Sequence, residues 1–192
     1  MQAISTNKSY SNTKANALSH NVALEHFLKT EERKAFQMAI VATADQGESL
    51  DIVQDAMLRF VTHYASKPES EWVPLFYRIV QNLIVDWHRK QKVRKIILFW
   101  QESEETPMPT FFDHTTEPEH IIEKQQKCEQ SLNVLHNLPL KQQQCFLLRA
   151  WQGLSVKQTA HIMKCSEGSV KTHFSRASAK LKQLLESNHD HQ

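Results

Sequence analysis

Glycine is scarce in this chain, since the 192 residues include only three. Folds that bind nucleotide cofactors depend on glycine-rich turns, because glycine alone lets the backbone approach a phosphate closely and adopt positive φ angles without strain. Three glycines are too few for a Rossmann or P-loop architecture. The composition therefore favours a helical protein without a nucleotide-binding loop, and it predicts no cofactor and no enzymatic activity.

Apolar residues recur at helical spacing in the first half of the chain. A step of three or four residues places side chains on one face of an α-helix. In residues 48–64 this spacing predicts a buried face made of Leu50, Val53, Met57, Phe60 and Tyr64. In residues 71–90 it predicts a buried face made of Trp72, Phe76, Ile79, Val80, Leu83 and Trp87. The opposite face carries Arg78, Asn82, Val85 and Arg89, with Asp86 beside them.

A proline-rich acidic stretch divides the chain into two helical parts. Residues 101–123 contain seven acidic and no basic residues, and their prolines interrupt any helical period. We expect an all-α protein with a tail at 1–20, a first domain at 21–100, a flexible acidic linker at 101–123, a second domain at 124–187, and a tail at 188–192. Both domains are small and helical.

The net charge of +2 conceals an alternation of charged blocks. Residues 24–70 carry −3 and residues 71–100 carry +4, while the linker carries −7 and residues 124–187 carry +7. Blocks of this kind are typical of proteins that bind polyanions. Two basic blocks therefore indicate two candidate surfaces for DNA, and the first acidic block suits a protein partner.

The second half has the pattern of a helix-turn-helix. Helices are predicted at about 120–137, 141–151 and 156–163, and a longer one begins at 167. Gly153 stops the second helix, while Ser155 and Ser166 are suited to cap the last two helices. In a helix-turn-helix the second helix enters the major groove, and its first outward side chains meet the bases. Here these are Glu167, Ser169, Lys171, Thr172, Ser175 and Arg176.

Other classes of site find little support in the sequence. The eleven histidines and three cysteines lack the compact spacing of a metal site, so we predict no metal. Cys145 and Cys165 lie in apolar or turn contexts and are expected to pack rather than to act as redox sensors. No apolar run is long enough to cross a membrane, and no secretory signal begins the chain, so we expect a cytoplasmic protein without membrane insertion.

Several segments resemble those of bacterial sigma factors of the sigma-70 family, extracytoplasmic-function (ECF) type. SLDIVQDAMLRF resembles region 2.2, FYRIVQNLIVDWHRKQKVRK resembles regions 2.3 and 2.4, and LPLKQQQCFLLRAWQGLSVKQTAHIMKCSEGSVKTHFSRASAKL resembles region 4. The segments occur in the order that the family uses. The resemblance implies an RNA polymerase sigma factor, which binds core polymerase and promoter DNA and confers promoter-specific transcription initiation.

The resemblance also implies a role for each candidate surface. Core polymerase binding falls to Asp51, Gln54, Asp55 and Leu58. Recognition and melting of the −10 element falls to Tyr77, Arg78, Asn82, Asp86 and Arg89, with the loop Ala65–Glu71 as a pocket for a flipped base. The outward residues from Glu167 to Arg176 would recognise the −35 element as duplex. Members of this family often have an anti-sigma partner, which we expect here too.

The chain departs from the family at three positions. Gln142, Gln143 and Gln144 occupy a segment that usually carries an arginine, so a phosphate contact is missing there. Lys164 stands where the turn often has glycine, which predicts a left-handed lysine. Ala150 replaces a frequent aromatic.

Two other readings share parts of this pattern. A two-domain helix-turn-helix regulator would bind an operator without polymerase. A helical adaptor or anti-sigma-like protein would have no role on DNA.

Overall fold

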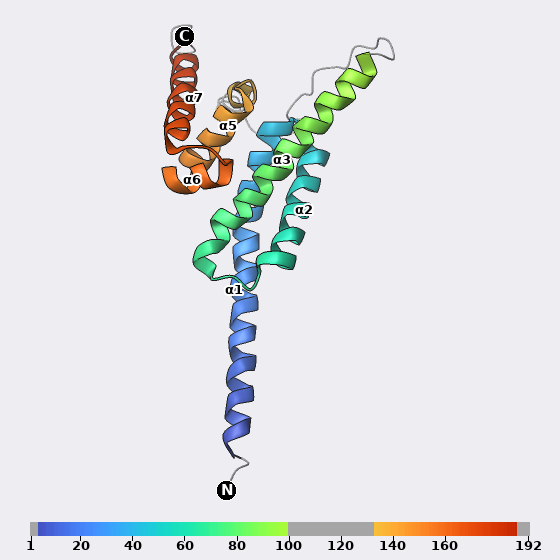
Figure 1. Ribbon diagram of the computed structural model, residues 1–192, viewed down its shortest axis with the longest axis vertical. Helices are drawn as coiled ribbons and strands as arrows, with labels where there is room; N and C mark the ends of the chain where they lie inside the picture. The colour runs from blue at the N-terminus through green and yellow to red at the C-terminus, as the bar shows by residue number, and fades with distance from the viewer. Residues whose placement is uncertain (1–3, 100–132, 188–192) are drawn as a thin grey trace, which may run out of the picture. The chain divides into compact units, whose positions relative to one another are not determined.

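The computed structural model describes residues 4–99 and 133–187, and every regular element within these ranges is a helix. The all-α prediction is therefore confirmed. The acidic linker and the last five residues lie outside the described residues. In chain order the elements are α1 (Ile4–Thr43), α2 (Gln46–Tyr64), α3 (Glu69–Phe99), α5 (Leu140–Phe146), the π-helix η1 (Leu147–Trp151), α6 (Val156–Met163) and α7 (Glu167–Ser187) (Figure 1).

The first helix begins much earlier than the sequence pattern suggested. Residues 1–20 were expected to form a tail, but α1 runs from Ile4 to Thr43. No glycine or proline occurs between these two residues, so nothing interrupts the helical hydrogen bonding. The chain forms two compact units, one through Lys34 and one from Ala35 onward.

A sharp break separates α1 from α2. Ala44 adopts a positive φ of 56°, which ends α1, and the Asp45 side chain accepts a hydrogen bond of 2.9 Å from the backbone N–H of Glu48. The hydroxyls of Thr43 and Ser49 lie 2.8 Å apart and are buried. These short polar side chains satisfy the backbone groups that a helix end leaves without partners, so α2 starts at a defined residue.

Aromatic contacts hold α2 against α3. The ring of Phe60 meets Phe76 edge-on at a centroid distance of 5.8 Å and Trp72 edge-on at 6.3 Å. All three side chains are buried, and edge-to-face pairs add to the free energy gained by burial. The indole N–H of Trp72 donates to the Lys67 carbonyl at 2.8 Å, which ties the connecting loop to α3.

Two details of this helix pair differ from the prediction. The buried face of α2 consists of Ser49, Ile52, Val53, Ala56 and Phe60, whereas Leu50 is 44% exposed. The buried face of α2 is therefore turned about the helix axis from the predicted one, toward Ser49 and Ala56. The loop is also shorter than Ala65–Glu71, since α3 already begins at Glu69.

The second half starts with a helix that changes type. The sequence predicted one helix over 141–151, but α5 ends at Phe146 and continues as the π-helix η1. The N–H of Gln152 donates to the Leu147 carbonyl five residues earlier, at 3.0 Å. Gly153 then adopts a φ of 65° and ends the segment, as predicted. Leu147 and Leu148, the first two residues of this π-helix, are both buried.

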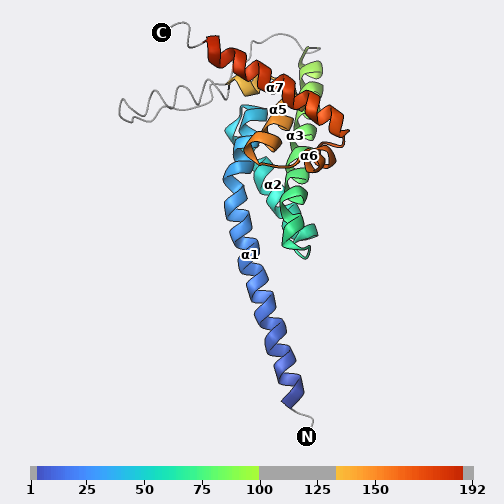
Figure 2. The ribbon, with the colours of Figure 1, turned by 90° about the vertical axis from the view of Figure 1, so that its left-hand side faces the viewer.

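The helix-turn-helix prediction is confirmed in its local geometry (Figure 2). Ser155 and Gln158 form a capping box at the start of α6, and the Ser166 hydroxyl accepts from the Ser169 N–H at 3.1 Å at the start of α7. Lys164 is left-handed, with φ 51° and ψ 49°. The core of the motif contains Cys145, Ala160 and Val170, so the small Ala160 lies where α6 and α7 approach.

Lys164→Gly should stabilise the protein, because the left-handed conformation is strained for lysine and relaxed for glycine. We expect the free energy of unfolding to rise by about 0.5–1 kcal/mol in urea titrations. Lys157→Gly removes the same charge from the right-handed part of α6 and should instead lower it by about 1 kcal/mol. Equal effects of the two substitutions would contradict strain at Lys164.

Candidate protein- and DNA-binding surfaces

The outer face of α2 carries the predicted polymerase-binding residues in one stripe. Asp51, Gln54, Asp55 and Leu58 follow each other at steps of three, one and three residues, and Leu58 is 68% exposed. Sequence reasoning placed Leu50 in the core and did not consider Val61. Both are more than 40% exposed and continue the same stripe. The stripe is therefore an acidic helix face with exposed leucine and valine side chains, which suits a protein partner.

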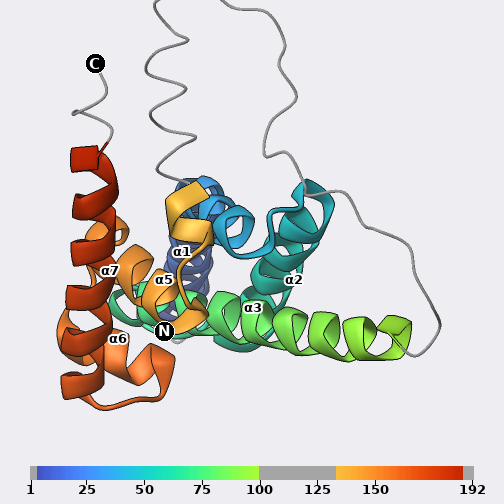
Figure 3. The same cartoon turned by 90° about the horizontal axis from the view of Figure 1, so that it is seen from above.

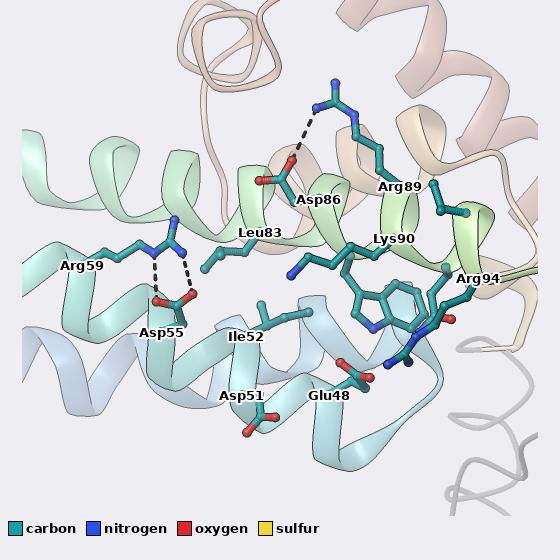
Figure 4. Close-up of a pocket in the computed structure, with 13 residues that line it drawn as sticks. Glu48, Asp51, Ile52, Asp55, Arg59, Leu83, Asp86, Arg89, Lys90 and Arg94 are labelled. Atoms are coloured by element: carbon teal, nitrogen blue, oxygen red, sulfur yellow. Dashed lines mark hydrogen bonds and ion pairs between the residues drawn. The ribbon is translucent and has the colours of Figure 1, made fainter. Parts of the chain in front are cut away.

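A groove of about 830 Å³ lies between the outer faces of α2 and α3. Its two walls have opposite charge (Figure 4). The α2 wall contributes Glu48, Asp51 and Asp55, and the α3 wall contributes Arg89, Lys90 and Arg94. Arg59 holds Asp55 in a two-pronged ion pair with both distances at 2.8 Å, while Asp51 projects from the exposed side of the helix.

Four of the five predicted −10 residues share one face of α3. Asn82, Asp86 and Arg89 are exposed and Arg78 is half-buried, at steps of three or four residues. Tyr77 is an exception, because its side chain is fully buried and meets the Phe76 ring edge-on at 5.6 Å. Tyr77 therefore belongs to the core of this structure rather than to its surface. Arg78, the next residue, belongs to the polar face instead, because successive side chains of an α-helix point about 100° apart.

Side chains of α2 and α6 surround Arg78 on this face. Its guanidinium lies 5.8 Å from the centre of the Tyr64 ring, and one of its nitrogens lies 3.4 Å from the Tyr64 hydroxyl. Another nitrogen lies 3.4 Å from Nε2 of His161 in α6. These contacts orient the Arg78 guanidinium at the boundary between α3 and the helix-turn-helix.

The outer face of α7 presents the residues predicted for duplex DNA. Glu167, Lys171, Thr172, Ser175 and Arg176 are exposed, whereas Val170 and Ala177 on the opposite face are buried. Ser169 differs from the expectation. It is half-buried, and its hydroxyl lies 2.9 Å from that of Ser166. Ser169 thus takes part in the helix cap, and the groups available to DNA are those of its exposed neighbours.

Burial shifts the pKa of two groups in the helix-turn-helix. Burial raises the pKa of the Cys145 thiol to about 11, and the nearby Cys165 adds to this effect. A thiol with so high a pKa stays protonated at neutral pH and is a poor nucleophile, which agrees with the predicted packing role. Burial also lowers the pKa of His173, with the positive charges of Lys141 and Arg176 acting in the same direction.

The profile of the family described as "Sigma-70, region 4" matches residues 129–181 of this chain. That range holds the whole helix-turn-helix. Along most of its length the chain also resembles "RNA polymerase sigma factor SigZ" of Bacillus subtilis, with 27% identity over 74% of this chain and 75% of the relative. These matches are to sigma factors of the sigma-70 family, which is the resemblance that the sequence segments predicted.

Further relatives extend the match of this chain. It is 25% identical to the "RNA polymerase sigma-E factor" of Streptomyces avermitilis over 85% of each chain. It is 26% identical to "ECF RNA polymerase sigma factor EcfG" of Rhodopseudomonas palustris over 79% of this chain and 78% of the relative.

Solved structures share the fold. The sigma factor RpoE of Bartonella quintana, determined in complex with the anti-sigma factor NepR, aligns with a TM-score of 0.61 and 20% identity over 84% of this chain and 96% of that chain. CnrH, determined with the cytosolic domain of CnrY, aligns with a TM-score of 0.55 and 18% identity over 87% and 90% of the two chains.

The glutamines in the segment where the resemblance predicts an arginine are mostly interior. Gln143 and Gln144 are each 1% exposed, and Gln142 is half-buried. Sequence reasoning interpreted them as a lost phosphate contact and missed their packing role. Ala150, at the position of the frequent aromatic, is exposed. Within the described residues, no three histidine, cysteine or acidic side chains gather as metal ligands, and no helix is both long and apolar enough to span a membrane.

The lowered pKa of His173 predicts a loss of stability in acid. Because folding favours the neutral imidazole, its contribution is full above the ordinary histidine pKa of about 6.5 and falls as the pH drops below that value. In urea titrations at pH 7.5 and pH 5.5, His173→Gln should therefore lose less stability on acidification than the wild type. The control is the exposed His26: His26→Gln should lose as much stability between pH 7.5 and pH 5.5 as the wild type does. If His173→Gln lost as much stability on acidification as the wild type, the result would contradict a lowered pKa of His173.

Proposed function

We propose that this sigma factor binds core RNA polymerase and directs promoter-specific initiation through two separate DNA surfaces. The observation that carries the proposal is the helix-turn-helix itself. Its recognition helix α7 is capped at Ser166, positioned by the left-handed Lys164 and polar along its exposed face. That geometry suits insertion of the first turns of α7 into a major groove, where the side chains of Lys171 and Arg176 reach base edges or phosphates.

The proposed division of labour follows the charge of each surface. Residues 21–100 form a domain that docks on polymerase through the acidic face of α2 and binds the −10 element through the polar face of α3. Residues 124–187 form the domain that reads the −35 element as duplex. The linker at 101–123 carries −7 and would be repelled by DNA, so we place it in a protein channel of the polymerase.

Strand opening requires no catalytic group in this proposal. Arg78, Asn82 and Arg89 offer donors to the backbone of a separated strand, and the free energy of binding that strand drives melting. Tyr77 is not included, because it is buried. We therefore propose a non-catalytic, cytoplasmic subunit without a cofactor or metal.

An anti-sigma factor is a further proposed partner. RpoE of Bartonella quintana was solved with the anti-sigma factor NepR, and CnrH with the cytosolic domain of CnrY. Both share the fold of this chain. The exposed leucine and valine side chains of α2 and the polar face of α7 are the surfaces that such a partner would cover.

Reconstituted transcription tests the proposal directly. Core polymerase with this protein should initiate at a defined set of promoters on a genomic DNA library, and core alone should not. A helix-turn-helix regulator would instead bind duplex DNA specifically in the absence of polymerase. Operator binding without any core-dependent initiation would overturn the proposal in favour of that alternative.

Asp51→Arg should abolish binding to core polymerase, because it reverses the charge at the centre of the acidic α2 face. Asp51 is exposed, so the fold should persist, and circular dichroism checks this. Binding is measured by native gel shift or interferometry with purified core. Glu32→Arg makes the same charge change at an exposed position of α1 and should leave affinity for core within about two-fold. Equal affinity of wild type and Asp51→Arg would remove α2 from the proposed interface.

Arg176→Ala should weaken use of the −35 element by about 1–3 kcal/mol if the guanidinium binds a base edge. The measurement is the transcription rate from promoters that differ at single −35 positions. Lys180→Ala removes the same charge one turn further along α7 and should reduce transcription evenly across these promoters. A promoter profile of Arg176→Ala that matches that of Lys180→Ala would show that Arg176 contacts only phosphate.

A further inference from the structure

A small polar interface, called the joint from here on, connects the second half of the chain to α3 and to the end of α1. At its centre the Gln81 side chain of α3 donates a hydrogen bond to the side-chain oxygen of Gln144 in α5. Beside it, the Gln143 side chain donates to the Val41 carbonyl at 3.0 Å, and Nδ1 of His136 lies 2.9 Å from the same carbonyl. The joint therefore holds together segments that lie far apart in the sequence.

The polar groups of the joint are only partly paired. Gln81, Gln143 and Gln144 are all buried, yet Oε1 of Gln81, Oε1 of Gln143 and Nε2 of Gln144 have no hydrogen-bond partner among the residues that the structure describes. A buried amide group without a partner costs at least as much free energy as one hydrogen bond contributes. Separation of the two halves would bring these three groups into contact with water. The amides at the centre of the joint therefore add little net stability to the closed arrangement.

The joint brings the two candidate DNA surfaces together. Arg78 belongs to the polar face of α3, and one of its guanidinium nitrogens lies 3.4 Å from Nε2 of His161 in α6. Arg78 also lines the same small cleft as Glu167, the first residue of α7. One end of the proposed −10 surface therefore adjoins the start of the proposed −35 surface.

A promoter requires these two surfaces to be far apart. Elements centred near −10 and −35 are separated by about 25 base pairs, which is about 85 Å along B-form DNA. A protein with the joint intact presents both surfaces at one cleft, so it cannot reach both elements of a straight promoter. Residues 100–132 connect the two halves, and a chain of that length spans at most about 110 Å when fully extended. The length of the connection therefore permits the separation.

We propose that the joint is an intramolecular clasp, which keeps the free protein closed and has to open before the protein can bind both promoter elements. The half-paired amides of Gln81 and Gln144 set the balance between the two forms. They allow α3 and α5 to pack together, and they gain hydrogen bonds to water when the halves separate. The need for opening rests on the proposed function, but the closed free form and its dependence on these two glutamines do not.

Single-molecule energy transfer tests the clasp, because it counts closed and open molecules of the full-length protein. Dyes attached through non-canonical amino acids at exposed Thr62 of α2 and exposed Lys180 of α7 report the distance between the halves. The free wild type at pH 7.5 should be mostly closed. Transfer should be lost when the protein and core polymerase bind a promoter recovered from the genomic library. A free protein that is mostly open, or a promoter complex that stays closed, would overturn the clasp.

Two pairs of substitutions at the centre of the joint have different expected effects. Gln81→Glu with Gln144→Glu places two carboxylates against each other in a buried site, so the open-to-closed ratio should rise at least ten-fold. Gln81→Met with Gln144→Met keeps the length of both side chains and removes the unpaired polar groups, so the ratio should not exceed that of the wild type. A glutamate pair that leaves the ratio unchanged, or a methionine pair that opens the protein, would contradict the role of the amides.

A control pair makes the same charge change away from the joint. Gln46 of α2 and Gln183 of α7 are exposed, so Gln46→Glu with Gln183→Glu should keep the ratio within about two-fold of the wild type. Opening in this pair as well would assign the effect to overall charge and overturn the clasp. Circular dichroism of every variant checks that the helices persist. A wild type that starts no promoter-specific transcription would contradict the proposed function alone, because the measurements on the free protein use neither polymerase nor DNA.

Discussion

The buried amide of Gln143 is the interaction on which the arrangement of the end of α1 and the helix-turn-helix depends. Its N–H groups reach the Val41 carbonyl at the C-terminal end of α1 and the Leu135 carbonyl before α5. A carbonyl at a helix end lacks a partner within its own helix, and a buried one without a hydrogen bond is costly. Gln143, in the second half of the chain, donates a hydrogen bond to this carbonyl. Two segments a hundred residues apart are thereby held in register through neutral groups alone.

Charge, in contrast, is kept on the outer faces. The buried stripe of α2 and the aromatic contacts of Phe60 fix the rotation of α2 and α3, which lie against each other (Figure 3). This rotation leaves Asp51 of α2 and the bases Arg89 and Lys90 of α3 exposed. In α7 the burial of Val170 and Ala177 likewise leaves Lys171 and Arg176 exposed to solvent. Each candidate surface is thus the solvent side of a helix whose other side is in the core. A protein with small cores can present several binding faces in this way.

Features set by neighbouring residues were predictable from the sequence, and features set by distant contacts were not. The capping by Ser155 and Ser166 and the left-handed Lys164 follow from local chemistry and were predicted correctly, as was the exposure of the outer α7 residues other than Ser169. The rotation of α2, the burial of Tyr77 and the role of Gln143 and Gln144 depend on which helices meet, so periodicity alone could not supply them. The expected tail at 1–20 failed for a different reason: a polar composition was given more weight than the absence of helix-breaking residues.

The glutamines after Leu138-Pro139 have a structural role that an arginine could not fill. The side chains of Gln143 and Gln144 are each 1% exposed, and an arginine at either position would bring a permanent positive charge into the contact of the helix-turn-helix with α1 and α3. Burying an unpaired guanidinium costs far more free energy than burying an amide with hydrogen bonds. Neutral amides therefore allow these helices to pack together without a buried charge.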